Sequence, residues 1–363
     1  MLPTTGDDGD RDPWGPGEPP RPGRATVRGA VQGDPWDDDV SGVIRPGRTA
    51  ERRSGVDRSG TERRADELTA ALVEEAADEP EEEIEVPFVP VRPRLSVAIA
   101  GFAGLLGLGL ILGAQTAGPG SRLPYAVVVF GVQLLFVLAW TMAQRPPALR
   151  TVAVVAVGVA VAADAVAMLP AEAGWHRLLY VFAGGVALIT VAQLAHRISW
   201  QRAKDALGGT ALTVGGVVAL ASLIVLTRRP GGTQTVLVCL TATAVALVAA
   251  RLLDAVFARP RIARQVPRGA TGIVAGAMLG TLVASILGSL LTVPFTPGVG
   301  AVIGFVAAGL AGLVDLGVNY AEAGRNMVGR APNLWVARHM QGPLGAFALA
   351  APVAYVLAVV FVA

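Results

Sequence analysis

Residues 95–114 read LSVAIAGFAGLLGLGLILGA, a run of twenty residues without a charged side chain. The hydrocarbon core of a bilayer is about 30 Å thick, so a helix needs roughly twenty mostly apolar residues to cross it. Arg92 and Arg94 come directly before the run, where basic residues mark a cytoplasmic helix end. The stretch therefore predicts a transmembrane helix that starts in the cytoplasm.

Eight further apolar runs of similar length follow, each bounded by Pro, Gly or charged residues. If nine helices alternate in direction, fourteen basic residues lie on the side of the N-terminus and four on the other side. This bias predicts a cytoplasmic N-terminus and a multi-pass protein of the plasma membrane. We therefore predict an all-α integral membrane protein, a polytopic bundle of about nine transmembrane helices. The expected spans are residues 95–114, 123–142, 151–169, 177–196, 206–227, 234–257, 270–293, 298–320 and 344–362.

The N-terminal part has a different composition from the rest. Residues 1–94 hold 22 acidic and 13 basic residues, whereas residues 95–363 hold 6 acidic and 17 basic ones. Residues 1–63 are rich in Pro, Gly, Asp and Arg and poor in apolar residues, which predicts disorder. The Ala- and Glu-rich residues 64–77 favour a short helix. We expect two parts, a disordered, acidic cytoplasmic tail over 1–94 and a transmembrane domain over 95–363.

The expected partners follow from this organisation. The charge asymmetry is typical of a tail joined to a membrane domain and does not indicate nucleic-acid binding. Membrane lipids are therefore the expected partners, and an oligomer is compatible with the sequence. The triplet Asp-Pro-Trp occurs at residues 12–14 and 34–36, either as a docking motif for a partner protein or by chance. The single cysteine, Cys239, excludes a disulfide within the chain and a thiolate metal cluster.

Small residues recur every four positions in several expected spans. Such spacing lets helix backbones approach closely in lipid, so it predicts helix packing and no chemistry. The steps are Gly109–Gly113, Gly272–Gly276–Gly280 and Gly300–Gly304.

Ionisable residues are rare within the expected spans, and each is a functional hypothesis because charge is costly in a membrane. Asp164 has no evident partner in its own helix, and it either bonds to a Ser, Thr or Arg across the bundle or stays protonated. Arg251 and Asp254 are three positions apart on one helix, which favours a structural ion pair.

The most informative polar pattern follows Asp315. Asp315, Asn319, Glu322 and Asn326 are spaced to lie on one face of a helix. Their oxygen atoms are of the kind that binds a divalent cation, and Asp315 and Glu322 are the candidate metal ligands. The alternative is that only Asp315 lies deep while the others form a solvated helix end.

Residues 254–361 resemble the C-terminal half of the phosphatidate cytidylyltransferases, membrane enzymes that make CDP-diacylglycerol. The resemblance rests on short segments in the family's order. Asp254 precedes a basic loop, Val266-Pro-Arg-Gly-Ala-Thr-Gly272 opens a Gly-rich helix, and Val314-Asp-Leu316 stands where the family has Gly-Asp-Leu. His339 follows in a loop, and Ala350-Ala-Pro-Val-Ala-Tyr355 lies in the last span.

The catalytic motifs of that family do not match. The lysine of its Ser-Pro-x-Lys motif is absent, residues 319–330 lack the family's lysine and second aspartate, and residues 343–346 replace its Asp-Arg-x-Asp. The resemblance implies Asp315, Glu322 and Asp254 as candidate catalytic residues, with Mg²⁺ as cofactor only if the chain is active. The arginines that would bind the nucleotide or headgroup are Arg264, Arg268, Arg325 and Arg330.

Three functions follow from these observations. The first is a non-catalytic relative of the cytidylyltransferases that acts as a scaffold or binds a lipid headgroup. The second is an active membrane cytidylyltransferase with a different ligand set. The third is a small-solute transporter in which Asp164 and Asp315 line a path, although the sequence shows no internal repeat of the kind common in transporters.

Overall fold

The computed structural model describes residues 88–117, 122–169, 174–291, 293–327 and 335–362. Within these residues it contains nine helices long and apolar enough to cross a membrane and no strand. The expected all-α, nine-span bundle is thereby confirmed for the described part of the chain. The helices are α2 (Pro93–Gln115), α3 (Leu123–Gln144), α4 (Leu149–Met168), α5 (His176–Ala195), α6 (Trp200–Leu226), α7 (Gly232–Val256), α8 (Ala270–Leu290), α9 (Pro297–Met327) and α10 (Trp335–Phe361).

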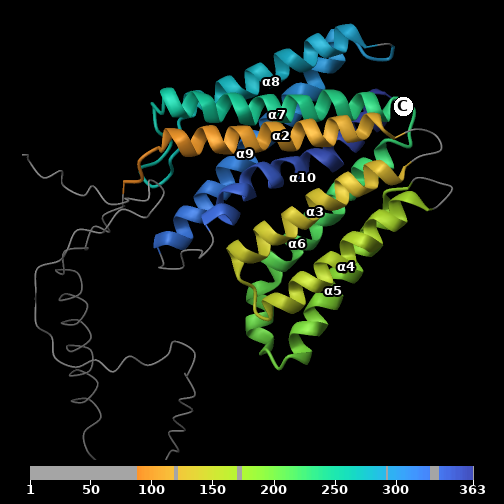
Figure 1. The fold of residues 1–363 in the computed structure, drawn as a ribbon, viewed down its shortest axis with the longest axis vertical. Coiled ribbons are helices and arrows are strands. Elements are labelled where there is room, and N and C mark those ends of the chain that lie inside the picture. Colours follow the sequence, from red (N-terminus) through yellow and green to blue (C-terminus); the bar gives the residue numbers. More distant parts are fainter. Residues whose placement is uncertain (1–87, 118–121, 170–173, 292, 328–334, 363) are drawn as a thin grey trace, which may run out of the picture. The chain divides into compact units, whose positions relative to one another are not determined.

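The nine helices form two groups that α10 joins (Figure 1). In the first group α7 packs against α2, α8 and α9, and in the second α6 packs against α3, α4 and α5. Helix α10 contacts both α7 and α9 of the first group and both α3 and α6 of the second. We call the end of the bundle at which α2 starts and α7 ends the tail side.

Small residues bring the helices of the first group into close contact, as the sequence predicts. An added Cβ on Gly276 would lie 2.5 Å from the Ala246 carbonyl oxygen of α7, and one on Gly280 would lie 2.6 Å from that of Ala242. This allows the α8 backbone to lie directly on α7. The prediction is wrong for Gly109, which has no neighbour within 4 Å in the described chain.

Three helices extend further toward the tail side than their apolar runs predict. Helix α6 begins at Trp200, α9 continues to Met327, and α10 begins at Trp335 with Pro343 inside it. Charged and proline residues led us to end these spans early. Each added segment lies at the tail-side end of its helix, where a solvated turn can carry charge.

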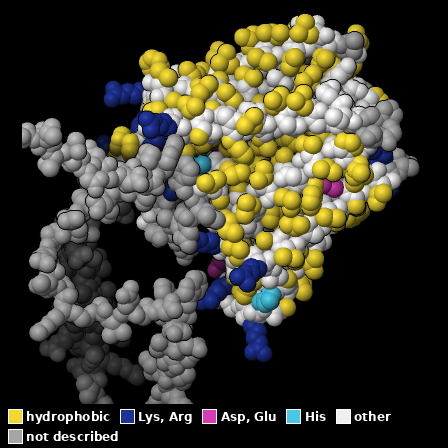
Figure 2. Space-filling view, viewed as in Figure 1, with side chains coloured by type: hydrophobic (Ala, Val, Ile, Leu, Met, Phe, Trp, Pro, Cys, Tyr) yellow, Lys and Arg dark blue, Asp and Glu magenta, His cyan; other side chains and the backbone are white. Residues whose placement is uncertain are grey.

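The surface agrees with a membrane-spanning bundle. Figure 2 shows apolar side chains spread over the bodies of the helices, while most visible Lys and Arg side chains lie toward the left and lower edges. Which membrane the bundle crosses, and on which side the tail lies, stay predictions. The expected tail and its short helix at 64–77 lie outside the described residues, apart from the segment that begins at Phe88.

Candidate functional site

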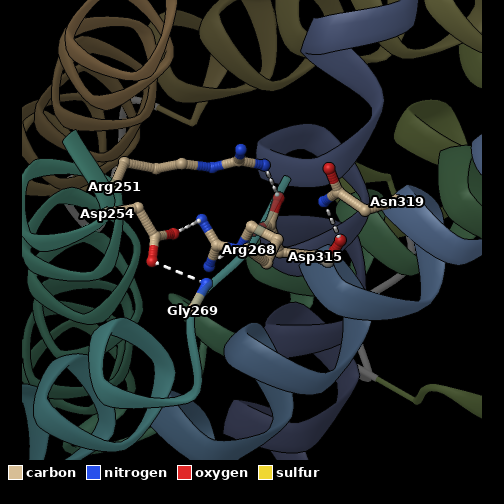
Figure 3. Close-up of polar contacts among 6 residues, drawn as sticks. All are labelled: Arg251, Asp254, Arg268, Gly269, Asp315 and Asn319. Atoms are coloured by element: carbon tan, nitrogen blue, oxygen red, sulfur yellow. Dashed lines mark hydrogen bonds and ion pairs between the residues drawn. The ribbon is translucent and has the colours of Figure 1, made fainter. Parts of the chain in front are cut away.

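Four charged side chains meet at the tail-side ends of α7, α8 and α9 (Figure 3). Arg251 and Asp254 come from the last turns of α7, Arg268 from the loop before α8, and Asp315 from α9. The Asp315 carboxylate lies 2.5 Å from Arg251 Nη2 and 3.0 Å from Arg268 Nη2, and Asp254 lies 2.8 Å from Arg268 Nη1. We call these four residues the charge cluster.

The loop before α8 is folded so that Arg268 points into the bundle. The backbone N–H of Gly269 donates to Asp254 Oδ1 over 3.0 Å, next to the Arg268 contact on the other carboxylate oxygen. A carboxylate at this place also faces the unpaired N–H groups at the start of α8, which favour negative charge. Asp254 therefore fixes both the start of α8 and the direction of Arg268.

Burial makes the pairing in the charge cluster stringent. Arg268 and Asp315 have no exposed surface, and Asp254 is only 1% exposed. Desolvation lowers the pKa of the Arg268 guanidinium, and the Asp315 carboxylate opposes that shift. Two arginines and two aspartates give the cluster zero formal charge, which is the arrangement that a low-dielectric interior tolerates.

The predicted ion pair between Arg251 and Asp254 is wrong. Arg251 pairs with Asp315 of α9, and Asp254 pairs with Arg268. Neighbours on one helix were the only partners that the sequence made visible, whereas the fold offers partners from other elements.

A cavity of about 170 Å³ lies beside the charge cluster, between α2, α7, α9 and α10. Arg251 borders both the cluster and the cavity, and its Nε atom is buried without an acceptor among the described residues. Three arginines and a histidine line this cavity against one carboxylate, so we call it the basic cavity. Its polar lining residues are Arg92, Ser96, Arg251, Asn319, Glu322, Arg338 and His339.

The segment before α2 forms one wall of the basic cavity. Val89, Pro90 and Val91 line it, and the loop between α7 and α8 holds this segment in place. Arg261 Nη1 donates to the Val89 carbonyl oxygen over 2.7 Å, and its guanidinium lies 4.3 Å from the centre of the Phe88 ring. The Val89 N–H donates in turn to the carbonyl oxygen of Arg264 over 3.1 Å.

An apolar pocket of about 160 Å³ adjoins the basic cavity between α2 and α10. The two share Leu95, Ile99 and His339, and the remaining lining of the second pocket is apolar. A polar cavity next to an apolar one at a helix end is suited to a molecule with a charged head and a hydrocarbon tail.

The described residues do not fit a magnesium site. Among them no group of three or more His, Cys, Asp and Glu side chains gathers around one point. Asp315 is bound by two arginines, and Glu322 accepts a hydrogen bond from Arg338 Nε. Mg²⁺ would have to displace a guanidinium group to reach either carboxylate, so we derive no step that needs the ion.

The oxygen-bearing face of α9 is only partly buried. Asn319 donates from Nδ2 to the Asp315 carbonyl oxygen over 2.5 Å, whereas Asn326 is exposed. Asn319 and Glu322 line the basic cavity, so the face leads from the charge cluster into that cavity. Both alternatives left open by the sequence are thus partly realised, a buried start and a solvated end.

The predicted basic ligands do not act as one group. Arg268 belongs to the charge cluster, and Arg264 contributes its carbonyl oxygen to the wall of the basic cavity. Arg325 Nη2 donates to Gln341 Oε1 over 3.4 Å, and Arg330 lies outside the described residues. Their role as nucleotide or headgroup ligands stays a prediction.

Asp164 lies in the other helix group. Its Oδ1 atom accepts a hydrogen bond from Gln133 Nε2 over 2.9 Å, and the same nitrogen donates to the Val217 carbonyl oxygen over 3.0 Å. The contact joins α3, α4 and α6 and is separate from the charge cluster. The partner is an amide, a residue type that we did not consider from the sequence.

Sequence reasoning missed three residues of the basic cavity. Arg92 and Arg338 counted only as topology signals, and His339 only as part of the resemblance. A usable signal was present for Arg338, because a basic residue at the start of α10 follows the acidic end of α9 across one short connection.

Comparison of the chain with family models, with curated proteins and with solved structures found no match. The argument for function therefore rests on the geometry of the site.

Proposed function

We propose that this chain is a multi-pass membrane protein that binds a phosphate-bearing lipid headgroup in the basic cavity without catalysing a reaction. The observation that carries the proposal is the position of this cavity beside an apolar pocket that shares three of its residues. A phosphate would meet guanidinium groups in the first and its acyl chains would lie in the second. Arginine suits such a role because its planar group binds phosphate through two parallel hydrogen bonds.

The charges around the basic cavity favour an anion. Arg251 is paired with Asp315 and Arg338 with Glu322, while no carboxylate among the described residues pairs with Arg92. The lining thus keeps about one uncompensated positive charge in addition to the buried Arg251 Nε donor. An anion accepting from these groups would satisfy a donor that otherwise stays without a partner.

The size of the cavity favours a headgroup over a nucleotide. Pockets that enclose a drug-sized molecule measure about 300–1,000 Å³, and the basic cavity measures about 170 Å³. A phosphate group fits this space better than a complete nucleoside triphosphate does. The pairing of both candidate metal carboxylates with arginine points the same way.

The resemblance to the cytidylyltransferases enters here as part of the proposal. Three segments that carry it, at Asp254, Arg268 and Asp315, supply three of the four members of the charge cluster. This convergence supports a non-catalytic relative of those enzymes in bacterial phospholipid metabolism. The transporter alternative is weakened because Asp164 and Asp315 lie in different helix groups.

Binding to the purified full-length protein tests the proposal. The probes are short-chain phosphatidate, short-chain phosphatidylcholine and inorganic phosphate, measured by native mass spectrometry and calorimetry. We expect phosphatidate to bind more tightly than the other two. Arg92→Gln should weaken it about fivefold, since a basic group near an anionic headgroup contributes about 1 kcal/mol.

Arg94→Gln is the matched control, because Arg94 is also exposed near the start of α2 but does not line the cavity. Equal binding of phosphatidate and phosphatidylcholine would refute the proposal. Equal binding of inorganic phosphate and phosphatidate would assign the cavity to a free anion.

A further inference from the structure

A larger cavity lies between the two helix groups. It is an apolar groove of about 560 Å³ between α3, α5, α6, α9 and α10, and no charged side chain lines it. The aromatic rings of Phe136 and Trp140 lie in its lining, stacked with 4.3 Å between their centres. None of its lining residues belongs to the basic cavity, so the two sites are independent.

Glycines of α6 create this groove. Gly208, Gly215 and Gly216 line it, and a side chain at Gly216 would overlap the ring of Phe136. At Gly208 an added Cβ would meet no atom within 4 Å, so the space there is open. The groove thus exists because α6 lacks side chains along this face, and it is open to the lipid at Gly208.

One positive charge stands at the tail-side end of the groove. Lys204 is the only lysine of the chain, it is exposed, and it precedes Gly208 by one helical turn on the same face of α6. Trp200, at the first position of α6, is 57% exposed. An exposed tryptophan at a helix end is typical of the headgroup level of a membrane, which places Lys204 near lipid phosphates.

We propose that the groove holds one acyl chain of an anionic glycerophospholipid whose phosphate lies at Lys204. The apolar lining would leave the hydrogen bonds of a polar ligand unmade, which is costly. An acyl chain has no such groups, and it reaches the groove directly from the bilayer. The apolar contacts alone do not select one lipid, because bulk lipid is as apolar as the groove. Selectivity for an anionic lipid therefore comes from Lys204.

Photo-crosslinking of the full-length protein in nanodiscs tests this proposal. The probes are phosphatidylglycerol and phosphatidylcholine that carry a diazirine in one acyl chain, and mass spectrometry maps the labelled peptides. We expect labelling of residues 208–219 to be about fivefold stronger with the anionic probe. Lys204→Gln should abolish this preference, whereas Arg202→Gln, which lies on another face of α6, should preserve it.

A second pair of variants tests the groove itself. Gly208→Leu should fill its open end and reduce labelling by both probes. Gly158→Leu is the matched control, since Gly158 is also an exposed helical glycine without a neighbour within 4 Å but lies outside the groove. Labelling that is equal for both lipids and unchanged in Gly208→Leu would overturn the proposal. So would a dimer of the delipidated protein that Gly208→Leu dissociates, because the occupant would then be a second copy.

Discussion

Removing the charge of Asp315 should destabilise the bundle, and the structure sets the size of the effect. The Asp315 carboxylate pairs with Arg251 at 2.5 Å and with Arg268 at 3.0 Å. Asp315→Asn keeps the shape of the side chain but leaves two buried arginines with one aspartate. Breaking a buried ion pair by removing one partner costs about 3–5 kcal/mol.

The lower end of this range applies here. Arg268 keeps its contact with Asp254, and Arg251 borders the basic cavity, where water can solvate its guanidinium. We therefore expect a loss of about 3 kcal/mol in the free energy of unfolding. At about 2–4 °C per kcal/mol, this lowers the apparent melting temperature by roughly 6–12 °C.

Thermal unfolding of the purified protein in detergent measures the change. Asp205→Asn is the control, since Asp205 is an exposed carboxylate near the start of α6 and its loss should leave the melting temperature within about 2 °C of the original value. The double variant Asp315→Asn with Arg251→Gln restores zero charge in the cluster and should be more stable than Asp315→Asn alone. A single variant as stable as the original protein, or a double variant with additive losses, would refute this reasoning.

Three further predictions concern packing, topology and activity. Gly342→Ala should cost about 1–3 kcal/mol because the new Cβ would overlap the Asp315 carboxylate, whereas Gly317→Ala, with no neighbour within 4 Å, should be neutral or slightly stabilising in the same thermal assay. Topology reporters fused at residue 90 and at the C-terminus should report opposite sides of the membrane, and the same side for both would contradict the nine-span count. The purified protein should form no CDP-diacylglycerol from CTP, phosphatidate and Mg²⁺, and turnover that Asp315→Asn abolishes would contradict this.

The positions of the spans were predictable because every backbone N–H and C=O group inside a bilayer must bond within its own segment or barrel. Long apolar runs therefore become helices whatever their tertiary contacts are. The helix ends were less predictable, since they lie where water or protein can satisfy the backbone. Helix α10 shows this, because Pro343 looked like a boundary but lies within the helix.

The residues of the charge cluster were predictable as individuals but not as a set. Asp254, Arg268 and Asp315 stood out as ionisable residues or through the resemblance, and yet the sequence did not show that Arg268 is completely buried. Partners such as Arg251 and Asp315 are 64 positions apart, and only the packing of α7 against α9 brings them together. Long-range pairing of this kind leaves no periodic signal in one sequence.

The charge cluster also explains why binding and turnover separate in this chain. Phosphoryl transfer needs cations that neutralise the charge developing on the phosphates, and enzymes hold such metal ions with free carboxylates. Here Arg251, Arg268 and Arg338 occupy the carboxylates of Asp254, Asp315 and Glu322. These arginines stabilise the fold and shape one wall of the basic cavity, but their charge is already compensated. The cation left to attract a headgroup is Arg92 at the edge of the cavity, so the arrangement favours holding a phosphate over transforming it.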